Sequence, residues 1–354
     1  MSISISNFGV TDKNEPVKLF TVKNNNGASA VFTNWGATAV SIFMPDKNGK
    51  MLDVLLGFDN LKDYLVNHCY FGATVGRNGN RVKNAQFQIN GKSYYLDKNE
   101  RDKNDLHSGF NGYQKRVWDF TADEENNSVT FKLLSPDMDQ GFPGDFNISV
   151  TYTLTNDNGI EIQYNGICNK DTVANMTNHS YFNLNGHNSG SIINHDLKIN
   201  STKYAVVDNE SIPTGVLADV TNTPLDFTNF RRIADDIDSD FEQIKLVKGY
   251  DHSFLIDKKN KGLEKVATLK SNESGINMDV YTDCLAVQFY AGNYIDDVPQ
   301  VGKGGFTYGN RSGLCLETGF LPNSINEPKF ASPVLKANTP YVSKTIYKFS
   351  TITH

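Results

Sequence analysis

The sequence predicts a mainly β protein, an antiparallel sandwich or barrel with one or two short helices. Two observations support this prediction. Short runs of alternating apolar and polar residues follow one another along the 354 residues, whereas helical periodicity is rare. Asn-Gly pairs, which supply the positive φ angles of tight hairpin turns, also recur between these runs. The pairs are Asn26-Gly27, Asn48-Gly49, Asn90-Gly91 and Asn158-Gly159.

The strands most clearly indicated lie at the two hairpins and at the end of the chain. Residues 87–96 (FQINGKSYYL) and 152–164 (YTLTNDNGIEIQY) each predict strand, turn and strand. Residues 341–351 alternate well enough to form a closing strand. No Pro-, Ser- and Gly-rich linker and no internal repeat divides the chain, so residues 1–354 are expected to form one domain.

Two segments favour helix. Residues 61–67 (LKDYLVN) follow Asn60 and predict a short helix. Residues 229–246 predict a longer one, with Thr228 or Asn229 as its cap. The apolar residues that recur there at three- and four-residue spacing are Phe230, Ile233, Ala234, Ile237, Phe241 and Ile244.

Composition excludes several classes of function. Hydrophobic residues make up 38 % and charged residues 21 %, which is enough to bury a core. The net charge is −6 and no basic run stands out, so neither a nucleic acid nor a membrane is expected as a partner. The N-terminus lacks the pattern of a signal peptide, and no Gly-rich loop opens a helix after a strand as nucleotide cofactors require.

The four cysteines are widely scattered, and no two form a CxxC pair. A zinc site or a disulfide-stapled secreted domain is therefore not expected. Reduced, mostly buried thiols in a cytoplasmic protein are the expectation. The cysteines are Cys69, Cys168, Cys284 and Cys315.

Residues 175–186 (NMTNHSYFNLNG) raise the first question of function. Read as a strand, the segment has one packing face and one face of hydrogen-bonding groups with His179 at its centre. From this segment alone, the favoured reading of the polar face is the solvent side of an ordinary antiparallel strand. The residues on that face are Asn175, Thr177, His179, Tyr181 and Asn183.

A second candidate is Glu317, which lies in SGLCLETGFLPNSINEPKF (312–330). On a strand it shares a face with Gly313 and Cys315, while leucines pack on the other face. Partial burial raises the pKa of a carboxyl group toward the range of a general base. The alternative is a glutamate at the rim, paired with a nearby Lys or Arg.

Arg77 and Arg81 lie among glycines and asparagines in residues 70–87. A guanidinium donates two hydrogen bonds to adjacent oxygens, such as neighbouring sugar hydroxyls. Either arginine could instead brace a loop, and this reading is favoured for Arg77.

Four further polar residues are candidates, and each also has an ordinary structural explanation as a satisfied polar group. His107 is expected in a loop, and Asp251 stands next to His252. Gln288 is expected on an apolar strand, where its amide needs a partner.

Taken in order, these segments resemble the aldose 1-epimerases, also called galactose mutarotases. The resemblance extends from about residue 34 to the C-terminus, and NHSYFNLNG combined with ETGFLPNSINEPKF is its most specific part. The segments are GATVGRNGNRV, LHSGF, NMTNHSYFNLNG, GYDHSF, VQFYAGN and ETGFLPNSINEPKF.

The resemblance implies a β-sandwich of the galactose mutarotase type that interconverts the α and β anomers of free hexoses such as D-galactose and D-glucose. It implies no metal and no cofactor, an aldose as the partner, and a monomer or homodimer. Glu317 corresponds to the family's catalytic base, His179 to its general acid, and His107 to a second active-site histidine near the ring oxygen. The implied substrate-contacting residues are Asn80, Arg81, Tyr181, Asp251 and Gln288.

Three positions depart from the family's usual pattern and bear on sugar preference. Ser108 follows the loop histidine where a glycine is common. Gly79 stands in place of an alanine, which is expected to loosen the loop that carries Arg81. Gly319 stands where glutamine is common.

Four competing readings remain open at this point. A carbohydrate-binding protein on the same fold would need neither an acid nor a base. An epimerase for a 6-phosphorylated hexose would need a basic cluster, for which Lys303 and Arg311 are the nearest candidates in sequence. A glycoside hydrolase would need two carboxylates. A Cys315 nucleophile would need a neighbouring base.

Overall fold

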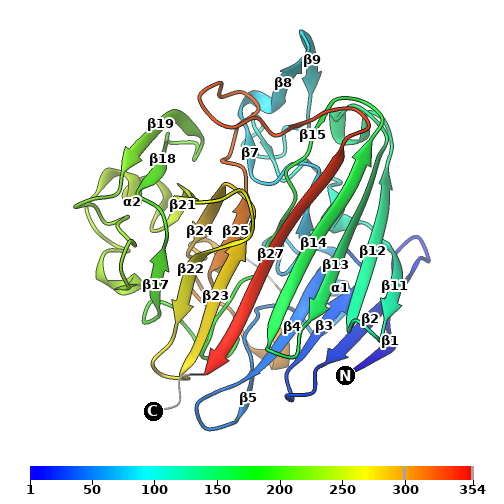
Figure 1. The fold of residues 1–354 in the computed structure, drawn as a ribbon, viewed down its shortest axis with the longest axis vertical. Coiled ribbons are helices and arrows are strands. Elements are labelled where there is room, and N and C mark those ends of the chain that lie inside the picture. The colour runs from blue at the N-terminus through cyan, green and yellow to red at the C-terminus, as the bar shows by residue number, and fades with distance from the viewer. Residues whose placement is uncertain (298–299, 352–354) are drawn as a thin grey trace.

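The computed structural model describes residues 1–297 and 300–351. Its largest element is a nine-stranded antiparallel sheet, whose long strands cross the front of the molecule in Figure 1. In spatial order the strands are β11 (Asp119–Asp123), β12 (Ser128–Ser135), β13 (Phe146–Leu154), β14 (Gly159–Cys168), β27 (Pro340–Thr351), β23 (Ile276–Thr282), β22 (Glu264–Lys270), β17 (Asp196–Ile199) and β20 (Arg231–Arg232).

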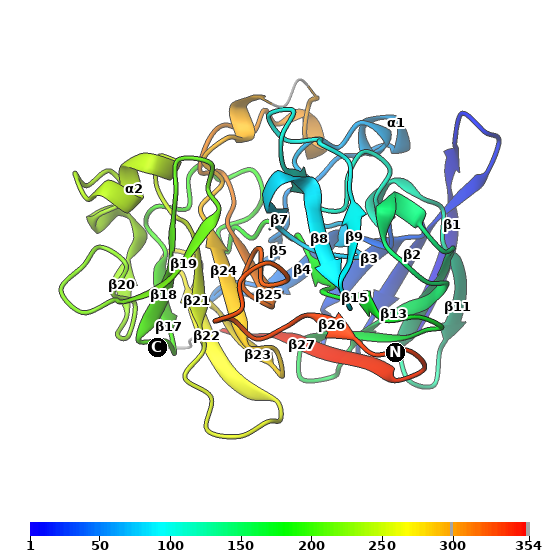
Figure 2. The same ribbon diagram turned by 90° about the horizontal axis from the view of Figure 1, so that it is seen from above.

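Two five-stranded antiparallel sheets form the second layer. The first consists of β1 (Ser2–Val10), β2 (Pro16–Lys23), β3 (Ser29–Thr33), β4 (Thr38–Pro45) and β5 (Met51–Asp53). The second, in spatial order, consists of β19 (Pro213–Asp219), β18 (Lys203–Val207), β21 (Asp251–Leu255), β24 (Ala286–Tyr290) and β25 (Cys315–Gly319). Seen from above, β24 and β25 lie between the β1–β5 sheet and the β17–β22 strands (Figure 2).

The remaining elements are short. The two-stranded pairs are β6 (Thr74–Val75) with β16 (Thr177–Asn178), β7 (Arg81–Val82) with β10 (Asp105–Leu106), β8 (Gln86–Ile89) with β9 (Lys92–Tyr95), and β15 (Thr172–Val173) with β26 (Val334–Leu335). The α-helices in the described ranges are α1 (Leu61–Leu65) and α2 (Glu242–Val247). The 3₁₀ turns are η1 (Lys83–Ala85), η2 (Tyr113–Lys115), η3 (Asp139–Gly141), η4 (Ile233–Asp235), η5 (Ile295–Asp297) and η6 (Lys303–Gly305).

The main core lies between the nine-stranded sheet and the two smaller sheets, as expected for a sandwich. On the first side Phe20 packs edge-on against Phe131, and Phe32 stacks on Tyr152 at 4.5 Å between ring centroids. Strand β13 shows the expected alternation, with every second residue buried. This alternation also sends every second residue of β25 outward, and Leu316 is one of the residues that face the core.

The Asn-Gly pairs mark turns, as predicted. All four lie at connections between antiparallel neighbours, β2–β3, β4–β5, β8–β9 and β13–β14. Only Asn90-Gly91 forms a two-residue turn with both φ angles positive, 52° and 78°. The 87–96 and 152–164 hairpins and the closing strand at 341–351 are likewise confirmed.

The short helix predicted after Asn60 is confirmed as α1, since the Asn60 side chain accepts the backbone N–H of Asp63 at 3.1 Å. The helix predicted over 229–246 is wrong in extent. Its first residues form β20 and η4, and only Glu242–Val247 is helical. Phe241 is the N-cap of that helix, so neither Thr228 nor Asn229 caps it.

The apolar residues of 229–246 are buried although most of the segment is not helical, because its backbone pairs with a neighbouring loop. Ile233, Ile237 and Ile244 are all buried in the main core. The backbone N–H groups of Ile233 and Ala234 donate to carbonyls of residues 195 and 193. Four aspartates between 235 and 240 disfavour a helix interior, because Asp competes for nearby backbone groups.

Neither α1 nor α2 is long and apolar enough to cross a membrane, and the same holds for every helix in the described ranges. No disulfide joins any of the four cysteines, all of which lie in those ranges.

Candidate functional site

An open cleft of about 210 Å³ lies on the side of β25 that faces away from the nine-stranded sheet. It gathers side chains from segments far apart in the chain. Seven of the eight residues expected in the site line this cleft together. The lining residues are His68, Cys69, Tyr70, Asn80, Arg81, Leu106, His107, His179, Tyr181, Asp251, Tyr290, Tyr294 and Glu317.

The 175–186 segment reaches the cleft without being a regular strand. Only Thr177–Asn178 forms strand β16, so the prediction of a continuous strand is wrong. The cause is side-chain hydrogen bonding to the local backbone. The Asn178 oxygen accepts the N–H of Ser180 at 3.1 Å, and the Asn183 oxygen accepts that of Asn185 at 3.1 Å.

Both sides of this segment are covered by protein, because residues 172–184 are all buried. The reading as a solvent-facing strand is therefore excluded. His179 and Tyr181 line the cleft, whereas Asn175 and Thr177 line a smaller cavity of about 20 Å³ beside it. The Asn183 amide lies outside the cleft, where it donates to the carbonyls of Gly190 and Ser312 at 2.9 Å.

Three neighbouring strands carry the acidic and amide groups. Ser253 on β21 is opposite Gln288 on β24, and Gln288 is opposite Glu317 on β25. Strand alternation turns Glu317 and Cys315 to the side opposite Leu316, as predicted. Glu317 is only 7 % exposed, so it is not a rim glutamate in a surface ion pair.

His179 and Glu317 face each other across the floor of the cleft. Nε2 of His179 lies 3.6 Å from Oε1 of Glu317. The ring of His107 stands edge-on to that of His179, with 5.2 Å between the ring centroids. Ligand atoms of His107, His179 and Glu317 all lie within 4.8 Å of one another. Groups from three distant segments thus meet at one point.

Burial governs the protonation of this pair. It raises the pKa of Glu317 to about 8, and the nearby charge of Asp251 acts in the same direction. It lowers the pKa of His179 to about 4. The free site therefore favours a protonated Glu317 beside a neutral His179.

His107 is also neutral, since burial, followed by the proximity of His179, lowers its pKa well below 6.5. Its Nδ1 accepts the backbone N–H of Asn80 at 3.2 Å, so the ring hydrogen must be on Nε2. Two histidines and a glutamate are a familiar zinc-binding set, but an Nε2 that carries hydrogen has no lone pair to offer a metal. His107 therefore fits the role of a hydrogen-bond donor and not that of a metal ligand.

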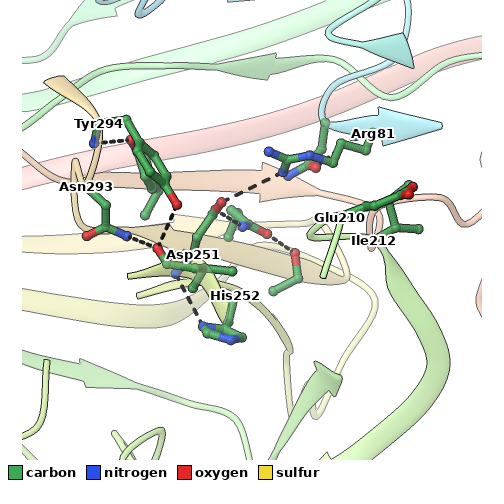
Figure 3. A network of polar contacts seen from close by, with 12 residues as sticks. Arg81, Glu210, Ile212, Asp251, His252, Asn293 and Tyr294 are labelled. Atoms are coloured by element: carbon green, nitrogen blue, oxygen red, sulfur yellow. Dashed lines mark hydrogen bonds and ion pairs between the residues drawn. The ribbon is translucent and has the colours of Figure 1, made fainter. Parts of the chain in front are cut away.

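Asp251 and Arg81 form the opposite wall. Oδ2 of Asp251 lies 3.8 Å from Nη1 of Arg81. Oδ1 of Asp251 accepts a hydrogen bond from the Gln288 amide at 2.6 Å. Nε of Arg81 donates to Glu100 at 2.8 Å. Figure 3 shows the Asp251 carboxylate pointing toward Arg81 while His252 points to the other side of the strand. His252 is thus a core residue and lies outside the cleft.

Gln288 lies beside the main cleft and not in its wall. It lines the smaller cavity together with Glu317, and both of its polar atoms are engaged, by Asp251 and by the Ser253 hydroxyl. Gln288 therefore fixes the orientation of Asp251.

Three basic residues considered from the sequence lie outside the cleft. Arg77 is 1 % exposed and donates to the carbonyls of Pro143 and Gly144, which confirms its bracing role. Lys303 pairs with Asp53 at 2.6 Å, and Arg311 pairs with Asp238 at 2.6 Å. Arg81 is the one Lys or Arg that lines the cleft in the described ranges, so no basic cluster for a phosphate is present there.

The departures from the family pattern are accommodated locally. A Cβ at residue 79 would lie 2.9 Å from Cγ2 of Thr177, so the Thr177 methyl group fills the space that an alanine would need. The Gly79 N–H also donates to the Asn175 carbonyl at 2.8 Å. Ser108 ties its loop to Asn78 through two hydrogen bonds of 2.8 and 3.0 Å. Asn78 and Gly79, which precede Arg81, are thus hydrogen-bonded to two other segments of the chain.

Gly319 borders the smaller cavity at the end of β25. A Cβ there would lie 2.5 Å from Oδ1 of Asn175, which accepts the N–H of Phe320. A side chain at this position would need Asn175 to move.

Sequence reasoning missed several aromatic residues of the cleft. Tyr70 packs against the rings of His107 and His179, at centroid distances of 4.7 and 5.7 Å. Tyr290 and Tyr294 form part of the wall near Asp251. Tyr70 immediately precedes the glycine-rich segment that carries Arg81, and this position was the only signal that could have drawn attention to it.

An acid–base pair in a cleft lined by hydrogen-bonding side chains, mounted on a large antiparallel sandwich, defines an enzyme that transfers protons on a polyhydroxylated substrate. A family model described as Aldose 1-epimerase matches residues 18–348, and the chain belongs to this family. The protein is accordingly an isomerase that acts on aldoses.

Relatives at high identity support the same family. The chain is 42 % identical over 340 residues to an aldose 1-epimerase of Haemophilus influenzae, covering 94 % of this chain and 96 % of the relative. It is 40 % identical over 318 residues to a galactose mutarotase of Mus musculus, covering 90 % of each chain.

Solved structures confirm the galactose mutarotase fold. A galactose 1-epimerase from Lactobacillus acidophilus superimposes with a TM-score of 0.86 at 28 % identity, covering 100 % of this chain and 99 % of that one. An aldose epimerase homologue from C. elegans also gives a TM-score of 0.86, at 29 % identity, covering 94 % of this chain and 98 % of the other.

Proposed function

We propose that the protein interconverts the α and β anomers of free hexoses such as D-galactose and D-glucose, with Glu317 as the base and His179 as the acid. The observation that supports this assignment is the 3.6 Å approach of Nε2 to Oε1 in the cleft. Glu317 removes the proton from the C1 hydroxyl, the C1–O5 bond breaks toward O5, and Nε2 of His179 gives its proton to O5. After rotation about C1–C2 the two groups reverse roles and the ring closes.

The protonation of the free pair suits this sequence of steps. The neutral pair and the ionised pair hold the same number of protons. Transfer of the Glu317 proton to Nε2 of His179 converts the neutral pair into the ionised pair. The ionised pair is needed before the ring opens, and ring opening returns both groups to their neutral forms. Because burial favours the neutral forms, the site favours the state that accompanies the open-chain sugar.

The other side chains hold the sugar. Asn80, Arg81, Tyr181 and Asp251 present donors and acceptors to its hydroxyls, and Gln288 acts through Asp251. His107 donates through Nε2–H near the ring oxygen. Such positioning keeps the reacting atoms aligned.

We also propose that the protein works in the cytoplasm as a monomer or homodimer. Cysteines without disulfides suit a reducing compartment. Cell fractionation and light scattering after gel filtration test these two points.

Polarimetry tests the reaction and its substrate class. Freshly dissolved α-D-galactose and α-D-glucose should lose their excess rotation faster with added protein, in proportion to its concentration. Glucose 6-phosphate should be a poor substrate, because Arg81 is already paired with two carboxylates. An unaccelerated rotation change for both free sugars would refute catalysis, and a preference for the phosphate ester would refute the proposed substrate class.

A further inference from the structure

Two side chains of strand β25 contact the two ring nitrogens of His179. Sγ of Cys315 lies 3.5 Å from Nδ1, and Oε1 of Glu317 lies 3.6 Å from Nε2. Residues 315 and 317 are alternate residues of β25, so their side chains leave the strand on the same face. The contact with Cys315 lies behind the ring, on the side away from the acid–base partner.

Three neighbouring rings also pack around the imidazole and restrict its rotation. The centroids of Tyr70, His107 and Tyr181 lie 5.7, 5.2 and 5.1 Å from that of His179. Both His179 and Cys315 are buried, at 5 % and 0 % exposure. With Cys315 fully buried behind the ring, the groups that face Nδ1 and Nε2 decide which nitrogen carries the hydrogen of the neutral ring.

Two observations place that hydrogen on Nδ1. At Nε2, burial raises the pKa of Glu317 to about 8, so in the free site a protonated carboxyl lies 3.6 Å away and can supply a hydrogen to that nitrogen. An Nε2 that accepts leaves the ring hydrogen on Nδ1, and Nδ1 faces Sγ of Cys315 at 3.5 Å. A thiol sulfur accepts as well as donates, so Sγ of Cys315 can take the Nδ1–H.

We propose that Cys315 is a positioning residue that accepts the Nδ1–H of His179 and so keeps Nε2 free to exchange a proton with the sugar. This role rests on the acid function proposed for His179. Without the sulfur, the neutral ring can hold its hydrogen on Nε2, and Nδ1 is then the only basic nitrogen, directed away from the cleft. Only the Nδ1–H form can take a proton on Nε2 and pass it to O5.

Nitrogen-15 NMR of histidine-labelled free protein at pH 7.5 reports the tautomer without reference to activity. His179 is assigned from the signal lost in His179→Asn. We expect the Nδ1–H tautomer in the parent and a mixture with Nε2–H in Cys315→Ala. Cys315→Ser, whose hydroxyl also accepts, should restore the parental tautomer. Cys315→Val, which fills the space without a strong acceptor, should behave as the alanine variant does.

Kinetics provide the second readout. Loss of a hydrogen-bond partner behind a metal-ligating histidine lowers activity by about 10- to 100-fold. We expect the lower end of that range here, so kcat in Cys315→Ala and Cys315→Val should fall about 10-fold, with KM within about twofold. Cys315→Ser should recover most of this loss. Cys168→Ala removes a thiol that is equally buried but lies outside the cleft, and it should leave both the tautomer and kcat unchanged.

The two proposals fail in distinguishable ways. An Nε2–H tautomer in the parent, or an unchanged tautomer in both Cys315→Ala and Cys315→Val, refutes the role of Cys315 even if mutarotation is fast. Absence of mutarotation in the parent refutes the acid–base assignment, while the NMR result on the tautomer remains valid.

Discussion

Glu317 combines a catalytic role with an unfavourable environment. The carboxyl group is 7 % exposed and lies near the charge of Asp251, a partly buried carboxylate. Its charge is therefore costly in the free protein, and Arg81 only partly offsets that cost. The same burial that makes the group a strong base when ionised also destabilises the fold at high pH.

Replacing Glu317 by glutamine should separate chemistry from binding. Glu317→Gln keeps the shape of the side chain and removes its basicity, so kcat should fall by about 10²–10⁴-fold. The sugar Kd, measured by calorimetry, should change by less than about fivefold. Glu161→Gln, on the nine-stranded sheet and paired with Lys344, is the control and should retain parental kcat. A Glu317→Gln enzyme with near-parental turnover would remove Glu317 from the mechanism.

The same variant should be more stable than the parent at alkaline pH. The pKa of Glu317 is about 8 in the folded protein, above its ordinary value near 4.5, so the folded state holds the proton more tightly. The parent therefore loses stability as the pH rises through 8, and glutamine does not. We expect Glu317→Gln to exceed the parent by about 1–3 kcal/mol at pH 9. Urea denaturation at pH 9 and pH 4 measures the difference, which should vanish at the lower pH.

At the scale of elements, the position of His179 depends on a close backbone crossing at Gly72. The Gly72 N–H donates to the His179 carbonyl at 3.0 Å, and Asn178 donates to the Gly72 carbonyl at 2.9 Å. Gly72 has φ +67°, and a Cβ there would collide with the Ala39 carbonyl oxygen. A glycine is thus required where the segment of the general acid meets the loop before β6.

Gly72→Ala should therefore be strongly destabilising. Gly49→Ala is the matched control, because Gly49 has φ +79° but no atom within 4 Å of an added Cβ. The control should cost about 1 kcal/mol from its φ angle alone. Gly72→Ala should cost at least about 2 kcal/mol more, because the collision adds to the φ penalty. Equal unfolding free energies for the two variants, measured in urea, would show that the crossing tolerates a side chain.

At the scale of the whole molecule, the nine-stranded sheet supports two smaller sheets, and the cleft forms where their elements converge. This construction buries four histidines in neutral form. Burial lowers their pKa values below the ordinary 6.5, to about 4 in two of them and about 3 in another. The four are His107, His179, His195 and His252.

The protein should therefore lose stability in mild acid. Between pH 6.5 and about 4 the unfolded chain binds protons on these histidines that the folded protein excludes, so stability falls as the pH decreases. The melting temperature should fall below pH 6.5, because the protons that the unfolded chain binds on four histidines outweigh the single proton that the folded protein holds on Glu317. A melting temperature that stays constant down to pH 5 would contradict the neutral burial of these rings. His252→Phe, which removes one such group outside the cleft, should reduce the slope.

The sequence by itself determined the features that depend on near neighbours. Period-two alternation placed Glu317 and Cys315 on one face of β25, and Asn90-Gly91 specified the β8–β9 turn. Motif resemblance brought the site residues together as a set before any distance was known. Local pattern predicted the wrong structure in two segments. Packing against distant segments replaced the helix predicted at 229–246, and side-chain hydrogen bonds to the backbone replaced the strand predicted at 175–186.

Only the tertiary structure decided which groups meet and in what protonation state. The 3.6 Å approach of His179 to Glu317, the hydrogen on Nε2 of His107 and the thiol behind His179 all depend on contacts between distant parts of the chain. Burial depth, which sets the pKa of each group, depends on the same contacts. A local sequence encodes the direction in which a side chain leaves its strand, whereas the atoms that the side chain then meets are fixed by the fold.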